Sequence, residues 1–171
     1  VHPSLPVATL KELVDYTRAH PGTVNYSTAT PTFMLAAESF KRRTGADMLH
    51  IPYTGGSPAL AALLAGTVQV SVIAGTTAIP QAKAGKIRVL AVTGTSRLSQ
   101  LPDVPTFAEA GVGDDVPVWS AVFAPAGTPR QIVDRLHAAI VRVLATSATR
   151  ERFIANSETI VASTPEELAA T

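Results

Sequence analysis

Three short runs of small hydroxyl residues and glycine are the part of this sequence best suited to chemistry. They are residues 27–32, 54–57 and 74–77, and each follows a predicted strand and precedes a predicted helix. The first turn of a helix offers unpaired backbone N–H groups and the positive end of the helix dipole, so a small anion binds there readily. Gly55 and Gly56 allow a ligand to approach the backbone closely. Helix capping alone explains any single run, but three runs at one sheet edge favour a site for a small anion.

Residue patterns that mark catalysis or metal binding are absent from the sequence. It contains no Gly-x-Ser-x-Gly elbow, no His-Glu-x-x-His and no Gly-x-Gly-x-x-Gly. Its histidines are His2, His20, His50 and His137, and no two of them have the spacing of metal ligands. There is no cysteine, which excludes disulfides, thiolate zinc sites and a cysteine nucleophile. We therefore expect no metal, no cofactor and no enzyme activity, and we interpret His50 as a hydrogen-bonded structural residue within a strand.

The composition is that of a folded chain with almost no net charge. The 171 residues carry 14 Lys and Arg against 13 Asp and Glu, a net charge of +1, and 46% of them are hydrophobic. That much apolar material can build a core, and the lack of a basic field argues against nucleic acid and acidic membranes as partners. No apolar run reaches the ~18 residues of a membrane-spanning helix. Because the sequence starts without Met and without a signal-peptide pattern, we expect that an upstream segment has been removed.

Helical and strand patterns alternate along the first half of the chain. Thr9 and Glu12 form a predicted capping box at the start of a helix that ends before Pro21, and Ser57 is predicted to cap another helix. The predicted strands cover residues 24–26, 48–51, 68–73 and 87–92, with helices between them, a short one at 78–84 and a further one at 106–111. This order predicts an α/β fold with a mostly parallel sheet, in which the carboxyl ends of the strands share one edge.

The C-terminal part contains the longest predicted helix, which opens at Thr128 and runs to Leu144. Its wide apolar stripe consists of Ile132, Val133, Leu136, Ile140, Val143 and Leu144. A strand is predicted before it at residues 118–124, and after it come a helix at 149–155, a strand at 160–162 and a capped helix from Thr164. Exposing the stripe would cost roughly 1.5–3 kcal/mol per side chain relative to burial. We therefore expect that this helix either packs on its own lobe or joins two copies of the chain.

Five segments of the sequence occur in an order that resembles a known family. They are Asn-Tyr-Ser at residues 25–27, His-Ile-Pro-Tyr-Thr-Gly-Gly-Ser-Pro-Ala at 50–59, Ala-Gly-Lys-Ile-Arg-Val-Leu-Ala-Val-Thr at 84–93, Leu-Pro-Asp-Val-Pro-Thr at 101–106 and Phe-Ala-Pro-Ala-Gly-Thr-Pro at 123–129. Together they resemble the periplasmic solute-binding proteins of tripartite tricarboxylate transporters, the TctC or Bug family. Members of this family are two-lobed Venus flytrap proteins, which bind small carboxylates between the lobes and pass them to a membrane permease.

The resemblance implies one lobe of a periplasmic-binding-protein fold, with a mostly parallel sheet flanked by helices. Residues 1–118 would form the second, ligand-binding lobe, and residues 119–171 a crossover strand and C-terminal helices that belong to the first lobe. The N-terminal sheet of the first lobe has no counterpart, so we expect the C-terminal part of a longer protein. The implied location is the periplasm, and the implied partners are the permease subunits and a small carboxylate, whether a di- or tricarboxylate, an amino acid or an aromatic acid.

The resemblance also places the carboxylate-binding loop of the family on Ser27, Thr28 and Ala29, and its Tyr-Lys-Gly-Gly segment on residues 53–56. Combined with the three runs, it predicts a site in which backbone N–H groups and hydroxyls hold a carboxylate without a buried arginine, and in which lobe closure buries the ligand. The predicted ligand-binding residues are Ser27, Thr28, Ala29, Thr30, Thr32, Tyr53, Thr54, Gly55, Gly56, Ser57, Thr76 and Thr77.

Three other interpretations remain open at this point. An effector-sensing domain of a regulator has the same type of fold, although no linked helix-turn-helix is visible in the sequence. A truncated remnant with no role in transport would also lack the first lobe. An enzyme comes last, because no nucleophile can be paired with a base. Among macromolecular partners, nucleic acid is not expected, and the helix at residues 128–144 is the predicted surface of a homo-oligomer.

Overall fold

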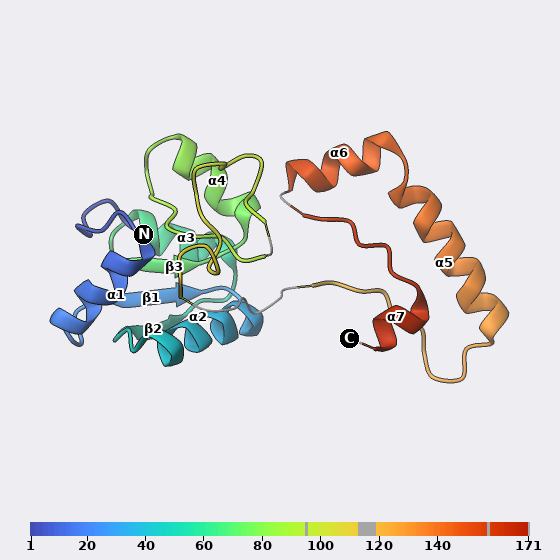
Figure 1. The fold of residues 1–171 in the computed structure, drawn as a ribbon, viewed down its shortest axis with the longest axis horizontal. Helices are drawn as coiled ribbons and strands as arrows, with labels where there is room; N and C mark the ends of the chain where they lie inside the picture. The colour runs from blue at the N-terminus through green and yellow to red at the C-terminus, as the bar shows by residue number, and fades with distance from the viewer. Residues whose placement is uncertain (95, 113–118, 157, 171) are drawn as a thin grey trace. The chain divides into compact units, whose positions relative to one another are not determined.

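The computed structural model describes residues 1–94, 96–112, 119–156 and 158–170. The chain divides into two compact units, Val1–Val118 and Trp119–Thr171. Figure 1 shows a sheet flanked by helices in the first unit and helices joined by extended segments in the second. The first unit confirms the predicted α/β class and carries all the candidate ligand-binding residues.

The sheet of the first unit has three parallel strands in the order β2-β1-β3. These strands are β1 (Asn25–Thr28), β2 (Leu49–Pro52) and β3 (Val70–Val72). In the central strand, Tyr26 lies opposite His50 on one side and Val70 on the other. Because both pairings are parallel, the carboxyl ends of all three strands lie at the same edge of the sheet.

Helices cover both faces of this sheet, and the side chains of the strands alternate between the two faces. Tyr26 and Val70 belong to a core cluster with α1 (Leu10–Ala19) and α2 (Pro31–Thr44). Ile51, one residue after His50, packs on the second face with Leu63 of α3 (Gly56–Leu64) and with α4 (Gly75–Lys83). The result is the helix–sheet–helix layering expected of an open parallel sheet.

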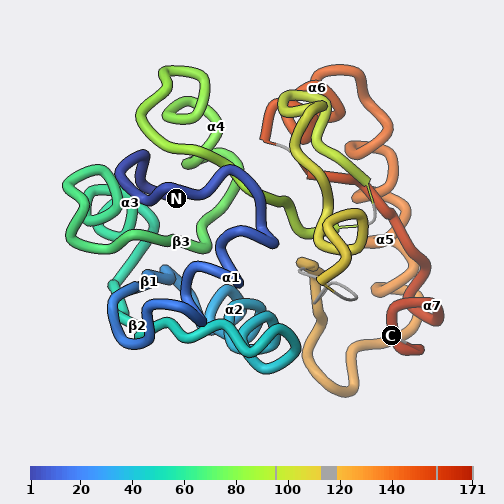
Figure 2. Tube along the Cα trace, turned by 60° about the vertical axis from the view of Figure 1, so that its left-hand side comes forward, coloured from blue at the N-terminus to red at the C-terminus, as the bar shows by residue number. Residues whose placement is uncertain are grey.

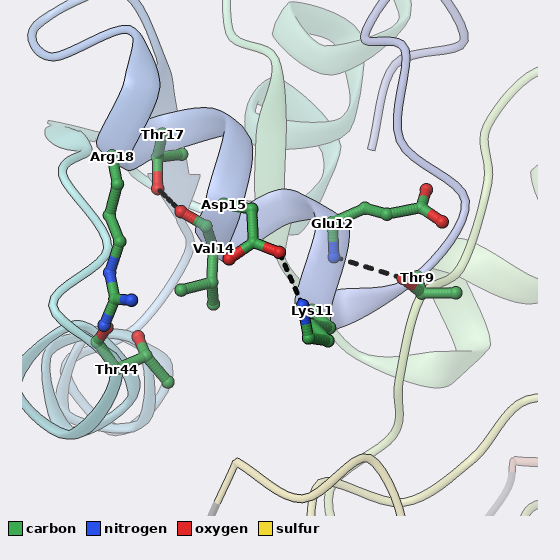
Figure 3. A network of polar contacts seen from close by, with 8 residues as sticks. All are labelled: Thr9, Lys11, Glu12, Val14, Asp15, Thr17, Arg18 and Thr44. Atoms are coloured by element: carbon green, nitrogen blue, oxygen red, sulfur yellow. Dashed lines mark hydrogen bonds and ion pairs between the residues drawn. The ribbon is translucent and has the colours of Figure 1, made fainter.

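The polar contacts of α1 connect it to the end of α2 (Figure 3). The Thr9 hydroxyl accepts the Glu12 N–H at 3.1 Å, as the predicted capping box requires. The Glu12 carboxylate instead accepts the N–H of Ala8, one residue earlier than in a capping box, so that half of the prediction is wrong. At the other end of α1, Arg18 donates to the carbonyl of Thr44, the last residue of α2.

The predicted strand at residues 87–92 is wrong, although its apolar residues Ile87, Leu90 and Val92 are buried as expected. The backbone of residues 87–92 forms its hydrogen bonds with segments outside the three-stranded sheet. The nitrogen of Val1 donates to the Arg88 carbonyl at 2.6 Å, and the Arg88 N–H donates to the Val1 carbonyl at 2.9 Å. Val92 forms one isolated parallel bridge with Thr106. Because these partners are scattered, no continuous ladder forms beside β3.

The predicted helix at residues 106–111 is a hydrogen-bonded turn in the structure. Thr106 and Glu109 form a capping box at its start, since the Thr106 N–H donates to the Glu109 carboxylate at 2.8 Å and the Glu109 N–H donates to the Thr106 hydroxyl at 3.1 Å. These side-chain bonds hold the turn together, and the chain does not continue it into a helix.

The second unit contains α5 (Arg130–Leu144), α6 (Ser147–Ala155) and α7 (Pro165–Ala169), coloured orange to red in Figure 2. Arg130 forms ion pairs with Asp134 at 2.7 Å and with Glu166 at 2.6 Å, which ties α5 to α7. The predicted strand at 160–162 is wrong, and residues 119–124 are also extended without ladder partners; Val118 lies outside the described residues. A strand needs a neighbouring strand, and the described residues of this unit contain none.

Four of the six residues in the apolar stripe of α5 are exposed, and Val133 and Leu144 are half-buried. The exposed fractions are 46% for Ile132, 51% for Leu136, 36% for Ile140 and 58% for Val143. No residue of this helix is buried. The amphipathic pattern was therefore interpreted correctly as a helix with an apolar face, and no described residue of its own unit buries that face.

Leu13→Ala tests the packing of α1 on the sheet. Leu13 is 2% exposed within the first core cluster, so its truncation leaves a cavity and lowers the free energy of unfolding by about 2–5 kcal/mol. Leu35→Ala removes the same atoms from a leucine of α2 that is 59% exposed, and we expect a loss below about 0.5 kcal/mol. Urea unfolding followed by circular dichroism compares the two variants, and equal losses would contradict the described packing.

Candidate functional site

The carboxyl edge of the sheet brings three helix N-termini to one side of the first unit. α2 begins at Pro31 after β1 ends at Thr28, α3 begins at Gly56 after β2 ends at Pro52, and α4 begins soon after β3. Neighbouring loops touch. The Tyr53 N–H donates to the Thr28 carbonyl at 3.3 Å, and a Cβ atom added at Gly56 would lie 3.6 Å from Thr77 Oγ1. The three predicted runs therefore lie along one edge, as their order in the sequence indicated.

The first loop contains two buried and several accessible candidates. Ser27 is fully buried and donates to the Ser71 hydroxyl of β3 at 2.8 Å. Thr28 is 3% exposed, and its Oγ1 lies 2.8 Å from His50 Nε2. Ala29 is half-buried, while Thr30 and Thr32 are exposed. Thr30 caps α2, and its hydroxyl accepts the N–H of Phe33 at 3.4 Å. The accessible part of this loop is thus residues 29–32, and the two residues before it support the loop from the sheet.

The second loop leads into α3 without a side-chain cap. Tyr53, Gly55 and Gly56 are half-buried, and Thr54 and Ser57 are exposed. The N-cap of α3 is Gly55, which has no side chain to accept the first N–H groups. The predicted cap at Ser57 is therefore wrong. The helix starts earlier because glycine and serine adopt helical dihedrals there and Pro58 fits the first turn, where its missing N–H costs nothing.

The third run, residues 74–77, is not the predicted loop, since α4 begins at Gly75. Thr76 is exposed and Thr77 is half-buried, and both lie in the first turn. The N-cap is Ala74, which again provides no side-chain acceptor. Two of the three helices at this edge therefore start with backbone N–H groups that no capping side chain occupies, which is the arrangement that suits an incoming anion.

The three loops contain no charged side chain. A charged pair lies further along α2 instead, where it contacts Tyr26 of β1. The Glu38 carboxylate of α2 accepts hydrogen bonds from Lys41 Nζ at 2.8 Å and from the Tyr26 hydroxyl. The hydrogen bond from Lys41, followed by that from Tyr26, holds the pKa of Glu38 below its ordinary value. Burial, followed by the neighbouring Glu38, raises the pKa of Tyr26. This cluster could not be predicted from the sequence, because the spacing of Tyr26 and Glu38 follows no helix or strand period.

Within the part of the chain that the structure describes, no three acidic, histidine or cysteine side chains gather as a metal site would require. The described helices are also too short or too polar for any of them to cross a membrane. What the edge can do chemically is to offer neutral hydrogen-bond donors to an anion.

The solved structures that this chain resembles have the periplasmic-binding-protein fold, and the parallel sheet flanked by helices agrees with them. A family model described as "Tripartite tricarboxylate transporter family receptor" matches residues 1–168. The chain therefore belongs to the TctC family. This is a family of transporter binding proteins and not a family of enzymes, in agreement with the resemblance seen in the sequence.

Similar proteins and structures support the same assignment. Protein BugT of Bordetella pertussis is 34% identical over 169 residues, which cover 97% of this chain and 52% of BugT. The R. palustris protein Rpa4515 with adipate has a TM-score of 0.88 and 32% identity, covering 99% of this chain and 58% of that one. MatC from Rhodopseudomonas palustris with bound malate has a TM-score of 0.72 and 31% identity, covering 95% and 55%. The chain spans about half the length of the curated relatives it matches.

Lys41→Met tests whether the Lys41 cation lowers the pKa of Glu38. Since the pKa of Glu38 in the folded chain lies below its ordinary value of 4.5, Glu38 contributes stability above about pH 4.5 that is lost as the pH falls through the folded pKa. Without the Lys41 cation, the pKa of Glu38 rises toward 4.5, and less stability is lost on acidification. Carbon NMR of the Glu38 carboxyl group measures the change directly.

Lys11→Met is the matched control for this experiment. Lys11 forms a similar short Lys–carboxylate pair on a helix of this unit, with Asp15 at 2.7 Å. We expect this variant to raise the pKa of Asp15 and to leave Glu38 unchanged. An unchanged Glu38 titration in Lys41→Met would refute the described cluster.

Proposed function

We propose that this chain is the ligand-binding part of a periplasmic solute-binding protein, which captures a small carboxylate for the membrane permease of a tripartite tricarboxylate-type transporter. The observation that carries the proposal is the carboxyl edge of the sheet, where three helices begin beside loops that contain no charged side chain. Adipate and malate, the ligands of two similar structures, are both small carboxylates. Their chemistry matches what neutral donors at helix N-termini bind.

In this proposal the carboxylate is held by hydrogen bonds and helix dipoles. Backbone N–H groups at the starts of α3 and α4 are preorganised donors, and the hydroxyls of Thr30, Thr54 and Thr76 are exposed beside them. A carboxylate taken out of water needs such partners, because burying it unpaired costs several kcal/mol. Nothing in this set is a nucleophile paired with a base, so the proposed role is capture and release without catalysis.

The two units have separate roles in this proposal. The unit Val1–Val118 carries the edge and acts as the ligand-binding lobe, while Trp119–Thr171 contributes helices to the other lobe. Closure of two lobes would then surround the ligand, and about 70–90% of a small ligand's surface is commonly buried in such a site. Since this chain spans about half of its relatives, it supplies only part of that enclosure.

We expect the 171-residue chain alone to bind adipate no more tightly than about 1 mM, because much of the enclosure is missing. Titration with tens of millimolar adipate should shift the amide NMR signals of Ala29, Thr30 and Thr32 and of residues 54–57 and 76–77. Hexanediol has the same chain length without charge and should not shift them. Micromolar binding in calorimetry would contradict the expected affinity, and shifts confined to other residues would contradict the site.

We further propose that the exposed stripe of α5 joins two copies of this chain. Leu136 and Ile140 are exposed on it, and burying such side chains is worth about 1.5–3 kcal/mol each. Sedimentation should show a dimer at high concentration, and Leu136→Asp should convert it to a monomer. Ala138→Asp, on the opposite side of the same helix, should leave the dimer intact. A strict monomer of the unmodified chain would refute this proposal.

A further inference from the structure

His50 connects the sheet to the first loop of the candidate edge. It lies in β2 directly opposite Tyr26 of β1, and the centroids of the two rings are 4.9 Å apart. Its Nε2 atom lies 2.8 Å from Thr28 Oγ1. Thr28 is 3% exposed, so the imidazole provides the hydrogen bond that a hydroxyl buried at the end of a strand requires.

Thr28 is the residue at which the first two loops of the edge meet. It ends β1, and Ala29 and Thr30 lead from it into α2. Its carbonyl accepts the N–H of Tyr53, the first residue of the second loop. A displacement of Thr28 would therefore move the backbone of both loops. By holding the Thr28 side chain, His50 fixes the direction in which their N–H groups point.

The titratable and charged groups that face His50 come from β1 and α2. β1 contributes Tyr26, and α2 contributes Glu38, which forms an ion pair with Lys41. Glu38 already accepts hydrogen bonds from the Tyr26 hydroxyl and from Lys41, so the charges of Glu38 and Lys41 offset each other. A proton on His50 would thus add positive charge beside loops that hold no charged side chain.

We propose that His50 is a positioning residue of the carboxylate site and that protonation of its imidazole strengthens carboxylate binding. This inference rests on the proposed function. Both ring nitrogens of an imidazolium donate hydrogen bonds, so protonation keeps the bond to Thr28, with the hydroxyl as acceptor. The loop geometry is retained while the added charge attracts the anion. By linkage, the bound carboxylate favours the protonated imidazole by the same factor.

The test follows malate binding to the full 171-residue chain through the amide NMR shifts of Ala29, Thr30 and Thr32. Malate binding is measured at about pH 6 and at about pH 8, because histidine is the side chain that commonly changes charge within this range. With malate's own ionisation taken into account, we expect the Kd of the unmodified chain to fall about three- to tenfold from pH 8 to pH 6. The titration midpoint of the His50 ring protons should also move to higher pH when malate is present.

Two matched variants separate the charge of His50 from its hydrogen bond. His50→Gln keeps an amide N–H that can donate to Thr28 and never becomes charged, so malate should still bind and the pH dependence should disappear. His20→Gln removes a different imidazole, which contacts the Tyr16 carbonyl at the end of α1, and should retain the full pH dependence.

The pH dependence of His50→Gln and the effect of malate on His50 decide whether the inference holds. Equal pH dependence in His50→Gln and the unmodified chain, or a His50 midpoint that malate does not move, would overturn it and leave the proposed function standing. An absence of amide shifts at Ala29, Thr30 and Thr32 at both pH values, with adipate as well as with malate, would overturn the proposed function and this inference with it. If His50→Gln does not fold, the midpoint of His50 in the unmodified chain, with and without malate, still decides.

Discussion

Parallel pairing of the central strand β1 with both of its neighbours is the constraint on which the rest of the first unit depends. Two parallel strands cannot be joined by a tight turn, so the chain must return across the sheet through a helix each time. Every such helix then starts at the edge where the strands end. The shared position of the three helix N-termini follows from this one arrangement, and it is what gathers the small, uncharged residues of the three loops at one edge.

Local patterns were sufficient to predict the elements that bury one side of an amphipathic segment. The helices around Leu13 and Phe40 and the strand at Tyr26 were predictable, because their apolar spacing and end signals agree with their packing. Residues 87–92 were not, because burial of an apolar run says nothing about which backbone will pair with it. That segment pairs with Val1 and Thr106, which lie far from it in the sequence.

The sequence was sufficient to predict where the candidate site lies, at one edge of the sheet. It was not sufficient to predict which atoms are accessible there. The order of strands and helices placed the three loops together, whereas the starts of α3 and α4 shifted by a few residues because glycine leaves the first helical residue poorly determined. Ser27 and Thr28 were predicted to contact a ligand from their position after a strand and from the family resemblance. The structure places both below the surface, bonded to Ser71 and His50. Those partners come from other strands, and their pairing depends on sheet register.

The contacts at the C-terminal end of α2 help to fix the position of its N-terminal end. Gly45 has a φ of +67°, and a Cβ atom there would lie 3.3 Å from the Arg18 guanidinium, which bonds to the Thr44 carbonyl. A larger residue at position 45 would strain the backbone and would also displace the Arg18 guanidinium. α2 has 14 residues and is therefore a rigid lever about 21 Å long. A tilt of about 3° at the anchored end would carry the other end through about 1 Å, so a substitution at Gly45 would act on the geometry of a loop that it never touches.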